Sequence, residues 1–293
     1  MRAGACWWLR AFLVIGGSAV VVGLTADTLV TAQVGFTHGL NPAPAYEGWE
    51  RNPDGSFSLV FGFFNRNCQE VLHIPIGPDN NIEPGGPDRG QPTSFFPGRG
   101  KFTFRVRVPA DFGKNELVWT LTAHGKTEKA YATLRPEYIL DKRIIMMNES
   151  SYGQRVGEGD NQYPVLTVEG DTRRVVKVGE PLQLNASASD DGLPFARKDR
   201  NSTGGPALVV GWFLYRGSLD DVAFDREHIN PDFRTRDTRC PNASPAPEAA
   251  TLRADGKFSV TATFKEPGTY VLRALVRDRA LKTTHDVTVT AAK

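Results

Sequence analysis

The sequence predicts an all-β protein that consists of two tandem antiparallel β-sandwiches behind an N-terminal signal segment. Three observations predict this fold class. Apolar residues alternate with polar ones over many short runs, Gly-containing turn dipeptides separate the runs, and no helical period of useful length follows the signal segment. The composition is that of a folded protein, because 40% of the 293 residues are hydrophobic and 10% are aromatic.

The N-terminus, residues 1–32, has the three parts of a secretory signal peptide. Two arginines precede an apolar run at residues 11–24, and small residues lead up to Ala32, so we expect cleavage before Gln33. The alternative is an uncleaved membrane anchor, although this run is shorter than the roughly 20 residues that span a bilayer. The sequence therefore predicts a periplasmic or extracellular protein with no stable membrane span after cleavage.

The first sandwich is predicted at residues 43–140, where three runs show apolar residues at every second position. Successive strand side chains point to opposite faces, so each run should bury one face and leave the other in water. Asp54-Gly55 and His124-Gly125 have the composition of tight hairpin turns. The alternating sets are Phe57, Leu59, Phe61 and Phe63; Phe102, Phe104, Val106 and Val108; and Leu117, Trp119 and Leu121.

The second sandwich is predicted at residues 164–293, with residues 141–163 as a linker between the two. The same alternation recurs here, and turn dipeptides such as Asp255-Gly256 separate the runs. The alternating sets are Leu182, Leu184, Ala186 and Ala188; Val210, Trp212 and Leu214; Phe258, Val260, Ala262 and Phe264; and Tyr270, Leu272, Ala274 and Val276.

Two long irregular segments, residues 77–100 and 227–250, interrupt the sandwiches. Loops of this length are uncommon unless they are functional or disordered. We predict an interaction surface at Phe95, Phe96 and Arg99, because aromatics beside an arginine are typical of binding hot spots. The alternative, which the sequence slightly favours, is that one Phe fills the core and the other covers the loop.

The second half resembles the polycystic-kidney-disease (PKD) and cadherin-like group of extracellular immunoglobulin-type sandwiches. The resemblance lies in Val178-Gly179-Glu180-Pro181-Leu182, in the segment from Leu184 to Gly192, and in Pro267-Gly268-Thr269-Tyr270 with Val276-Arg277-Asp278. One departure concerns the segment after Trp212, where PKD domains have a Gly-Asp-Gly sequence and this chain does not. The first half is similar only to uncharacterised exported bacterial proteins.

The resemblance to cadherin-like domains implies a calcium site at Asp190, Asp191 and Asp278. Calcium takes six to eight oxygen ligands, and acidic loops at the end of a sandwich supply them. The alternative is a plain turn whose carboxylates accept hydrogen bonds from nearby amides. The sequence favours the turn, so calcium is the weaker expectation and no other cofactor is predicted.

Cys68 and Cys240 remain after removal of the signal segment. In an oxidising compartment they could form a disulfide across the two sandwiches, but an even count does not fix connectivity. The alternative is two unpaired thiols, and we expect the pair to lie apart rather than in contact.

Motifs for catalysis are missing from the sequence. It has no His-Glu-x-x-His, Gly-x-Ser-x-Gly or Cys-x-x-Cys pattern, and its five histidines are scattered. A formal net charge of +2 also argues against a nucleic-acid binder.

The sequence therefore predicts an exported, non-enzymatic binding, adhesion or structural module that meets a protein or glycan partner at the cell envelope. The alternative is a hydrolase or carbohydrate-active accessory protein with a site built from the loops 77–100 and 227–250.

Overall fold

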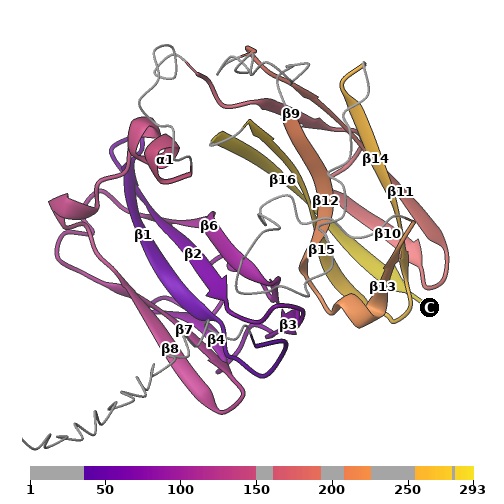
Figure 1. Ribbon diagram of the computed structural model, residues 1–293, viewed down its shortest axis with the longest axis horizontal. Coiled ribbons are helices and arrows are strands. Elements are labelled where there is room, and N and C mark those ends of the chain that lie inside the picture. The colour runs from indigo at the N-terminus through magenta and orange to yellow at the C-terminus, as the bar shows by residue number, and fades with distance from the viewer. Residues whose placement is uncertain (1–35, 150–160, 193–207, 226–254, 279–280) are drawn as a thin grey trace, which may run out of the picture. The chain divides into compact units, whose positions relative to one another are not determined.

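The computed structural model describes residues 36–149, 161–192, 208–225, 255–278 and 281–293. The predicted signal segment and the whole of the loop 227–250 lie outside these ranges. The regular secondary structure of the described residues is mostly strand, with one short α-helix and two 3₁₀ turns, so the all-β fold class is confirmed. They fall into two groups of sheets, which Figure 1 colours from indigo to magenta and from pink through orange to yellow.

The first group contains two three-stranded antiparallel sheets and one short two-stranded sheet (Figure 1). One sheet has the order β1-β2-β6 and another the order β4-β7-β8. The strands are β1 (Ala43–Arg51), β2 (Phe57–Asn65), β4 (Asn80–Glu83), β6 (Gly98–Val108), β7 (Leu117–Ala123) and β8 (Lys126–Ala132), with β3 (Leu72–His73) paired to β5 (Ser94–Phe95).

An aromatic cluster fills the core between these sheets. The Trp119 ring is fully buried and meets Phe61 and Phe104 edge-on, at centroid distances of 5.9 and 5.0 Å. The Phe61 and Phe104 rings stack at 5.2 Å. The residues of the three alternating sets lie in this core, apart from Phe102, which packs elsewhere, and Phe57, which is partly buried.

The predicted turn at His124-Gly125 is confirmed. It joins β7 to β8, and both residues have positive φ values of 50° and 70°. Two successive residues with positive φ are typical of a type I′ turn, which matches the twist of the strands that it joins.

The second group is an immunoglobulin-type sandwich. Its sheets have the orders β13-β14-β11-β9 and β10-β16-β15-β12, which correspond to the ABED and CFG sheets of that fold with β10 added beside the last strand. The strands are β9 (Val165–Val168), β10 (Arg173–Lys177), β11 (Pro181–Ser189), β12 (Leu208–Arg216), β13 (Val222–Phe224), β14 (Lys257–Phe264), β15 (Gly268–Asp278) and β16 (Leu281–Ala292). The more specific PKD assignment stays a prediction.

The expected linker contains a helix that the sequence analysis missed, α1 (Lys142–Glu149). Asp141 caps it, because its side chain accepts a hydrogen bond from the Ile144 backbone amide at 2.7 Å. Ile145 and Met146 are buried against a cluster that includes Val60 of β2 and Leu281 of β16. Residues 142–149 are therefore part of the packed structure. Short 3₁₀ turns also occur at η1 (Pro136–Tyr138) and η3 (Leu219–Asp221).

Both faces of two strands are buried, which differs from the prediction of one wet face per strand. On β2, Val60 is as completely buried as Leu59 and Phe61. On β12, Phe213 and Tyr215 are buried on the face opposite Trp212 and Leu214. The second faces pack in two further apolar clusters that combine residues of both sandwiches. Residues 34–293 accordingly form one compact unit, and the predicted domain boundaries inside it stay a prediction.

Candidate functional site: the seam between the sandwiches

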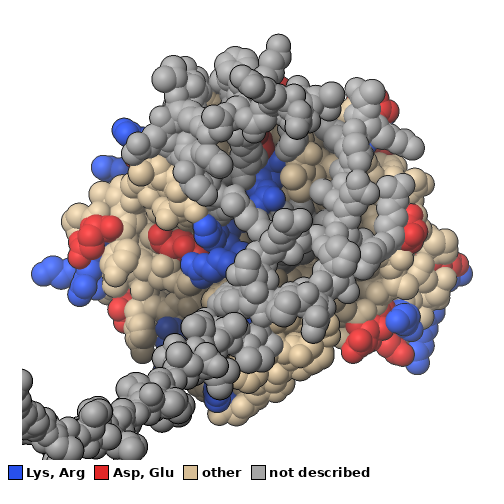
Figure 2. Space-filling model, in the orientation of Figure 1, with Lys and Arg blue, Asp and Glu red and all other residues tan. Residues whose placement is uncertain are grey.

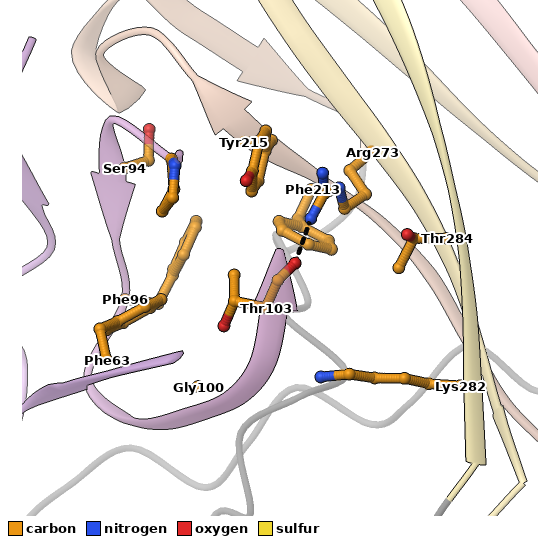
Figure 3. Close-up of a pocket in the computed structure, with 11 residues that line it drawn as sticks. Phe63, Ser94, Phe96, Gly100, Thr103, Phe213, Tyr215, Arg273, Lys282 and Thr284 are labelled. Atoms are coloured by element: carbon orange, nitrogen blue, oxygen red, sulfur yellow. Dashed lines mark hydrogen bonds between the residues drawn. The ribbon is translucent and has the colours of Figure 1, made fainter. Parts of the chain in front are cut away.

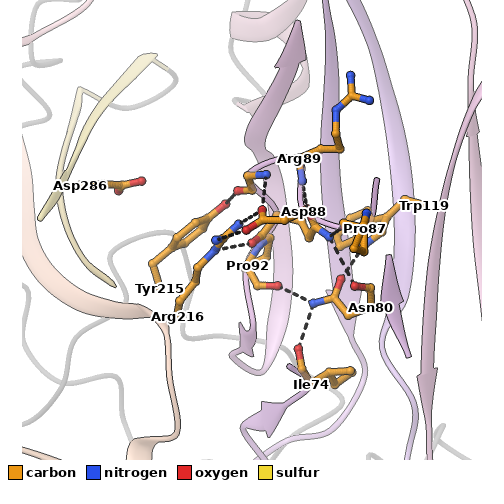
Figure 4. A network of polar contacts seen from close by, with 12 residues as sticks. Ile74, Asn80, Pro87, Asp88, Arg89, Pro92, Trp119, Tyr215, Arg216 and Asp286 are labelled. Carbon is orange, nitrogen blue, oxygen red and sulfur yellow. Dashed lines mark hydrogen bonds and ion pairs between the residues drawn. The ribbon is translucent and has the colours of Figure 1, made fainter. Parts of the chain in front are cut away.

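Two buried amide side chains hold the segment 77–100, and the first is that of Asn80 (Figure 4). Its Nδ2 donates to the carbonyl oxygens of Ile74 and Pro92, at 2.9 and 2.8 Å. Its Oδ1 accepts a hydrogen bond from Nε1 of Trp119 at 3.0 Å. Asn80 thus ties the long loop to the aromatic core of the first sandwich.

Gln91, also fully buried, shapes the next part of the loop. Its Nε2 donates to the Pro87 carbonyl at 2.5 Å, and its Oε1 accepts from the Arg89 amide at 2.8 Å. These bonds fix the backbone of residues 87–91 and present the Asp88 carboxylate and the Gly90 carbonyl to the second sandwich (Figure 4).

Residues 88–96, which we call the cover segment, run along the edge of β12. The Thr93 amide donates to the Tyr215 carbonyl at 3.2 Å, and the Gly217 amide donates to Thr93 Oγ1 at 2.9 Å. Ser94 Oγ donates to the Gly217 carbonyl at 2.7 Å. An edge strand presents unpaired backbone groups that invite association, so the cover segment blocks the C-terminal end of this edge, at residues 215–217. We call the whole contact between the two sandwiches the seam.

An ion pair reinforces the cover segment. Nη2 and Nη1 of Arg216 donate to the two carboxylate oxygens of Asp88, at 2.7 and 3.0 Å, and its Nε donates to the Gln91 carbonyl at 2.9 Å. The hydrogen bonds from Arg216 lower the pKa of Asp88 below its usual value. The Asp88 side chain is half exposed, so solvent screens the pair.

We expect Arg216→Ala to lower the free energy of unfolding by about 1 kcal/mol or less, because the pair is partly exposed. Its effect should shrink further in 1 M salt, where charges are screened within about 3 Å. Urea unfolding at low and high salt measures both quantities. An effect of Arg216→Ala that is unchanged by salt would contradict an electrostatic contribution from this pair.

The second polar contact of the seam is Arg273 of β15, which is 7% exposed (Figure 3). Its Nε and Nη2 donate to the Asp286 carboxylate at 2.6 and 2.8 Å, and its Nη1 crosses to the Thr103 carbonyl of β6 at 2.8 Å. Its guanidinium lies 3.4 Å from the centroid of the Tyr215 ring, a cation–π contact. Burial alone would lower the pKa of Arg273, but Tyr215 and Asp286 raise it above the ordinary value. Burial raises the pKa of Tyr215 to about 12.

An apolar cluster surrounds these polar contacts. Phe96 from the cover segment meets Phe213 edge-on at 6.2 Å, and Tyr215 and Leu275 complete the cluster. A cavity of about 20 Å³ remains between the two sandwiches here (Figure 3), which is the size of about one water molecule. The seam therefore holds an apolar centre together with hydrogen bonds and ion pairs.

Of the predicted interaction residues, Phe95 and Phe96 are buried and Arg99 is partly exposed. Phe95 is fully buried, with its ring against Phe63 and Trp119, and Phe96 is 7% exposed in the seam. Arg99 pairs with Glu47 at 2.7 Å. An external partner could bind only accessible side chains. The burial of Phe95 and Phe96 therefore does not match the prediction of an interaction surface at these residues. The arrangement corresponds to the alternative of one Phe in the core, except that the other contacts the second sandwich.

The predicted calcium ligands form separate hydrogen bonds. Asp278 is 2% exposed and accepts from Asn161 Nδ2 at 2.8 Å, and Asp191 accepts from the Gln162 amide at 2.9 Å. Asp190 accepts from the Gly192 amide at 3.0 Å, and its pKa is raised by burial. Across the described residues, no three His, Cys, Asp or Glu side chains gather closely enough to hold a metal ion. Calcium at this end of the sandwich stays a prediction.

Cys68 is disulfide-bonded, so the alternative of a free thiol at this position was wrong. The other two cysteines of the chain, Cys6 and Cys240, both lie outside the described residues. The pairing of Cys68 with Cys240 therefore stays a prediction.

An open groove of about 420 Å³ lies at one end of the first sandwich. Residues 72–79 form one wall and the tip of the β7–β8 hairpin, residues 122–124, forms the other. It contains two imidazoles: His124 is 2.9 Å from the Glu70 carboxylate, and burial lowers the pKa of His73 despite the opposing effects of Asp221 and Asp220. His73 is thus close to charged groups of the second sandwich.

The lowered pKa of His73 has a consequence for stability. A folded-state pKa below the unfolded value means that the unfolded chain binds the proton more readily, so stability falls as pH drops below about 6.5. We expect His73→Gln to lose less stability than the original chain between pH 7.5 and 5.5. Urea unfolding at both pH values tests this, with His38→Gln at an exposed position as the control. An equal loss of stability in His73→Gln and in the original chain would contradict this expectation.

Charges of both signs are interspersed on the face that Figure 2 shows. The ion pairs of the first sandwich include Arg105 with Glu50 at 2.7 Å and Arg107 with Asp54. Within the described ranges, no helix has the length and apolar character needed to cross a bilayer.

No model of a known protein family matches this chain, and no curated protein matches it. Among solved structures, domains 4 and 5 of the S-layer protein SbsC are similar at 9% identity and a TM-score of 0.26, over 61% of this chain and 66% of that one. Sidekick-1 immunoglobulin domains 1–4 are similar at 11% identity and 0.25, over 88% and 50%. The Yersinia pseudotuberculosis adhesin InvE is similar at 12% identity and 0.24, over 87% and 60%. The chain thus spans between half and two thirds of these structures, and likenesses at such TM-scores carry no functional argument.

Proposed function

We propose that this chain is an exported, non-enzymatic module of the cell envelope with a structural, adhesion or binding role, and that its two sandwiches act in it as one rigid body. The seam is the observation that most directly supports the rigid arrangement of the two sandwiches. Two domains that share only a small polar contact are expected to move relative to each other, whereas a large apolar contact opposes such motion. The seam adds apolar clusters to hydrogen bonds that cross from one sandwich to the other.

Rigidity suits a module that keeps a fixed spacing or transmits force at a surface. The cover segment couples the core of the first sandwich, through Asn80, to the edge of β12. Arg273 couples the second sandwich to the backbone of β6. A pull on either sandwich is therefore carried to the other through several contacts at once. The partner that this module would meet is a protein or a glycan of the envelope, not a nucleic acid.

The alternative function, a hydrolase or carbohydrate-active site built from the loops 77–100 and 227–250, has less support. The first of these loops is used in the seam, where its buried polar groups already have partners. The second loop lies entirely outside the described residues.

Two measurements test the proposed function. We expect cell fractionation of a bacterial host that expresses the full chain to place it outside the cytoplasm, with a mass that corresponds to cleavage before Gln33. A retained N-terminal segment would support the anchor alternative.

Purified protein should leave a panel of glycan, peptide and ester substrates unchanged. Hydrolysis that a single side-chain substitution abolishes would overturn the non-enzymatic role.

A further inference from the structure

The small cavity in the seam is lined by groups that suit an anion. It measures about 20 Å³ and lies beside Arg273, Lys282 and Thr103 (Figure 3). We propose that this cavity binds one chloride ion, which contacts both sandwiches and helps to hold them together. The inference rests on the seam that supports the proposed function, but it depends neither on export nor on an external partner.

The charge of the lining is positive. Arg273 and Lys282 are the charged residues among the described residues that line the cavity, and none of these lining residues carries a carboxylate. Asp286 lies outside the lining and accepts two hydrogen bonds from Arg273. Another cation, Arg277, lies directly opposite Lys282 in the pairing of β15 with β16, so both side chains share one face of the sheet. Like charges at opposite positions destabilise a sheet, and an anion beside Lys282 offsets that repulsion.

Two hydrogen-bond donors of the lining come from different sandwiches. Thr103 Oγ1 of β6 is buried and forms no hydrogen bond within the described part of the chain. The Lys282 ammonium has three N–H groups, and one of them donates to the Lys101 carbonyl. Figure 3 shows the Lys282 side chain extending from β16 toward β6, the strand that carries Thr103. A buried hydroxyl without a partner is unfavourable, and an anion between these residues accepts hydrogen bonds from both.

The size and the apolar surroundings of the cavity select among anions. Its volume holds about one particle of the size of a water molecule, so phosphate, sulfate and carboxylates are too large. Phe63, Phe96 and Phe213 contribute apolar surface to the lining, which suits chloride better than the more strongly hydrated fluoride. Thr284 also lines the cavity and is exposed, so an ion can enter from solvent while the seam stays closed.

The first test compares thermal unfolding of the full chain in sodium chloride, sodium bromide and sodium gluconate at equal ionic strength. Gluconate is too large for the cavity, whereas an ion that binds only the folded chain stabilises it. We expect the midpoint to be about 3 °C higher in chloride and bromide than in gluconate, as for a ligand at roughly ten times its dissociation constant. Equal midpoints in the three salts would overturn the proposal.

Substitutions of Thr103 locate the effect. Thr103→Val keeps the shape of the side chain but removes its hydroxyl, so most of the halide-specific shift should be lost. Thr103→Ser keeps the hydroxyl and should retain the shift. The matched control is Thr120→Val on β7, which does not line the cavity and should retain the shift as well. General effects of each salt act on all four chains, so a full shift in Thr103→Val would place the ion elsewhere and contradict the proposal.

Bromide provides a direct readout that does not require any variant to fold. Crystals of the original chain grown in sodium bromide should show an anomalous scattering peak in the cavity, between Lys282 and Thr103. A cavity without this peak, or one that holds only water, would overturn the proposal. Such a result leaves the rigid seam of the proposed function untouched, because the distance between labels on the two sandwiches is measured without halide.

Discussion

Replacing Asn80 by alanine is expected to lower the free energy of unfolding by about 3 to 5 kcal/mol. The substitution leaves the Trp119 Nε1–H and the carbonyls of Ile74 and Pro92 without their partner. A buried polar group that loses its partner costs about 1–3 kcal/mol, and partial relaxation of the loop offsets some of the sum. Because Asn80 holds the segment that leads to the seam, the loss should reach both sandwiches. Equilibrium unfolding in guanidinium chloride, followed by tryptophan fluorescence, measures the effect.

The matched control is Asn81→Ala, one residue further along the same strand. The Asn81 side chain is only half-buried and donates to Gly77 and Pro78 at the rim of the loop. We expect a loss of about 1 kcal/mol or less, because its partners can turn to water. Equal effects of the two alanine substitutions would show that Asn80 has no special part in holding the loop.

Replacing Arg273 by methionine is expected to cost about 2 to 4 kcal/mol, since the contacts of a buried ionic group are lost while apolar volume is retained. The Thr103 carbonyl loses the guanidinium that crosses the seam, and Tyr215 loses its cation–π partner. Asp286 is 40% exposed and can be solvated, which limits the cost. The variant should also weaken the coupling of the two sandwiches, so that calorimetry records two separated transitions in place of one.

Arg107→Ala provides the comparison for Arg273. Arg107 and Asp54 form an ion pair on the same protein, but their side chains are 65% and 53% exposed. Exposed pairs contribute at most about 1 kcal/mol, so we expect little change in stability and a single calorimetric transition. A large effect here, or a small one at Arg273, would contradict the account of which charges hold the seam.

The alternating runs predicted the strands and their inward faces because a half-buried strand repeats every second residue. That pattern could not reveal the seam, where both faces of a strand are covered. The signal for it was present in two continuous apolar runs, Leu59 to Phe64 and Leu208 to Tyr215. Such runs are typical of strands that are buried on both sides. Interpreting them as ordinary alternation led to the prediction of two separate sandwiches on a linker.

The polar residues of the seam were harder to predict. Asn80, Gln91, Thr93 and Ser94 lie in a segment rich in Pro and Gly, which has the composition of an exposed loop. They are buried because each finds a partner in the fold, and those partners are up to 124 residues away in the chain. No local pattern encodes contacts of that separation. The helix α1 was missed for a different reason: its eight residues are too few for a helical period, and only Asp141 marked its start.

Pulsed electron spin resonance between two labels tests the central claim, that the two sandwiches hold one relative orientation, most directly. Tyr131 of β8 and Val175 of β10 are suitable positions, because their side chains are 56% and 78% exposed and belong to different sandwiches. Labels attached through unnatural amino acids leave the cysteines untouched. We predict one narrow distribution of distances, which broadens in Arg273→Met. A broad distribution in the original chain would show that the sandwiches move independently and would contradict the claim.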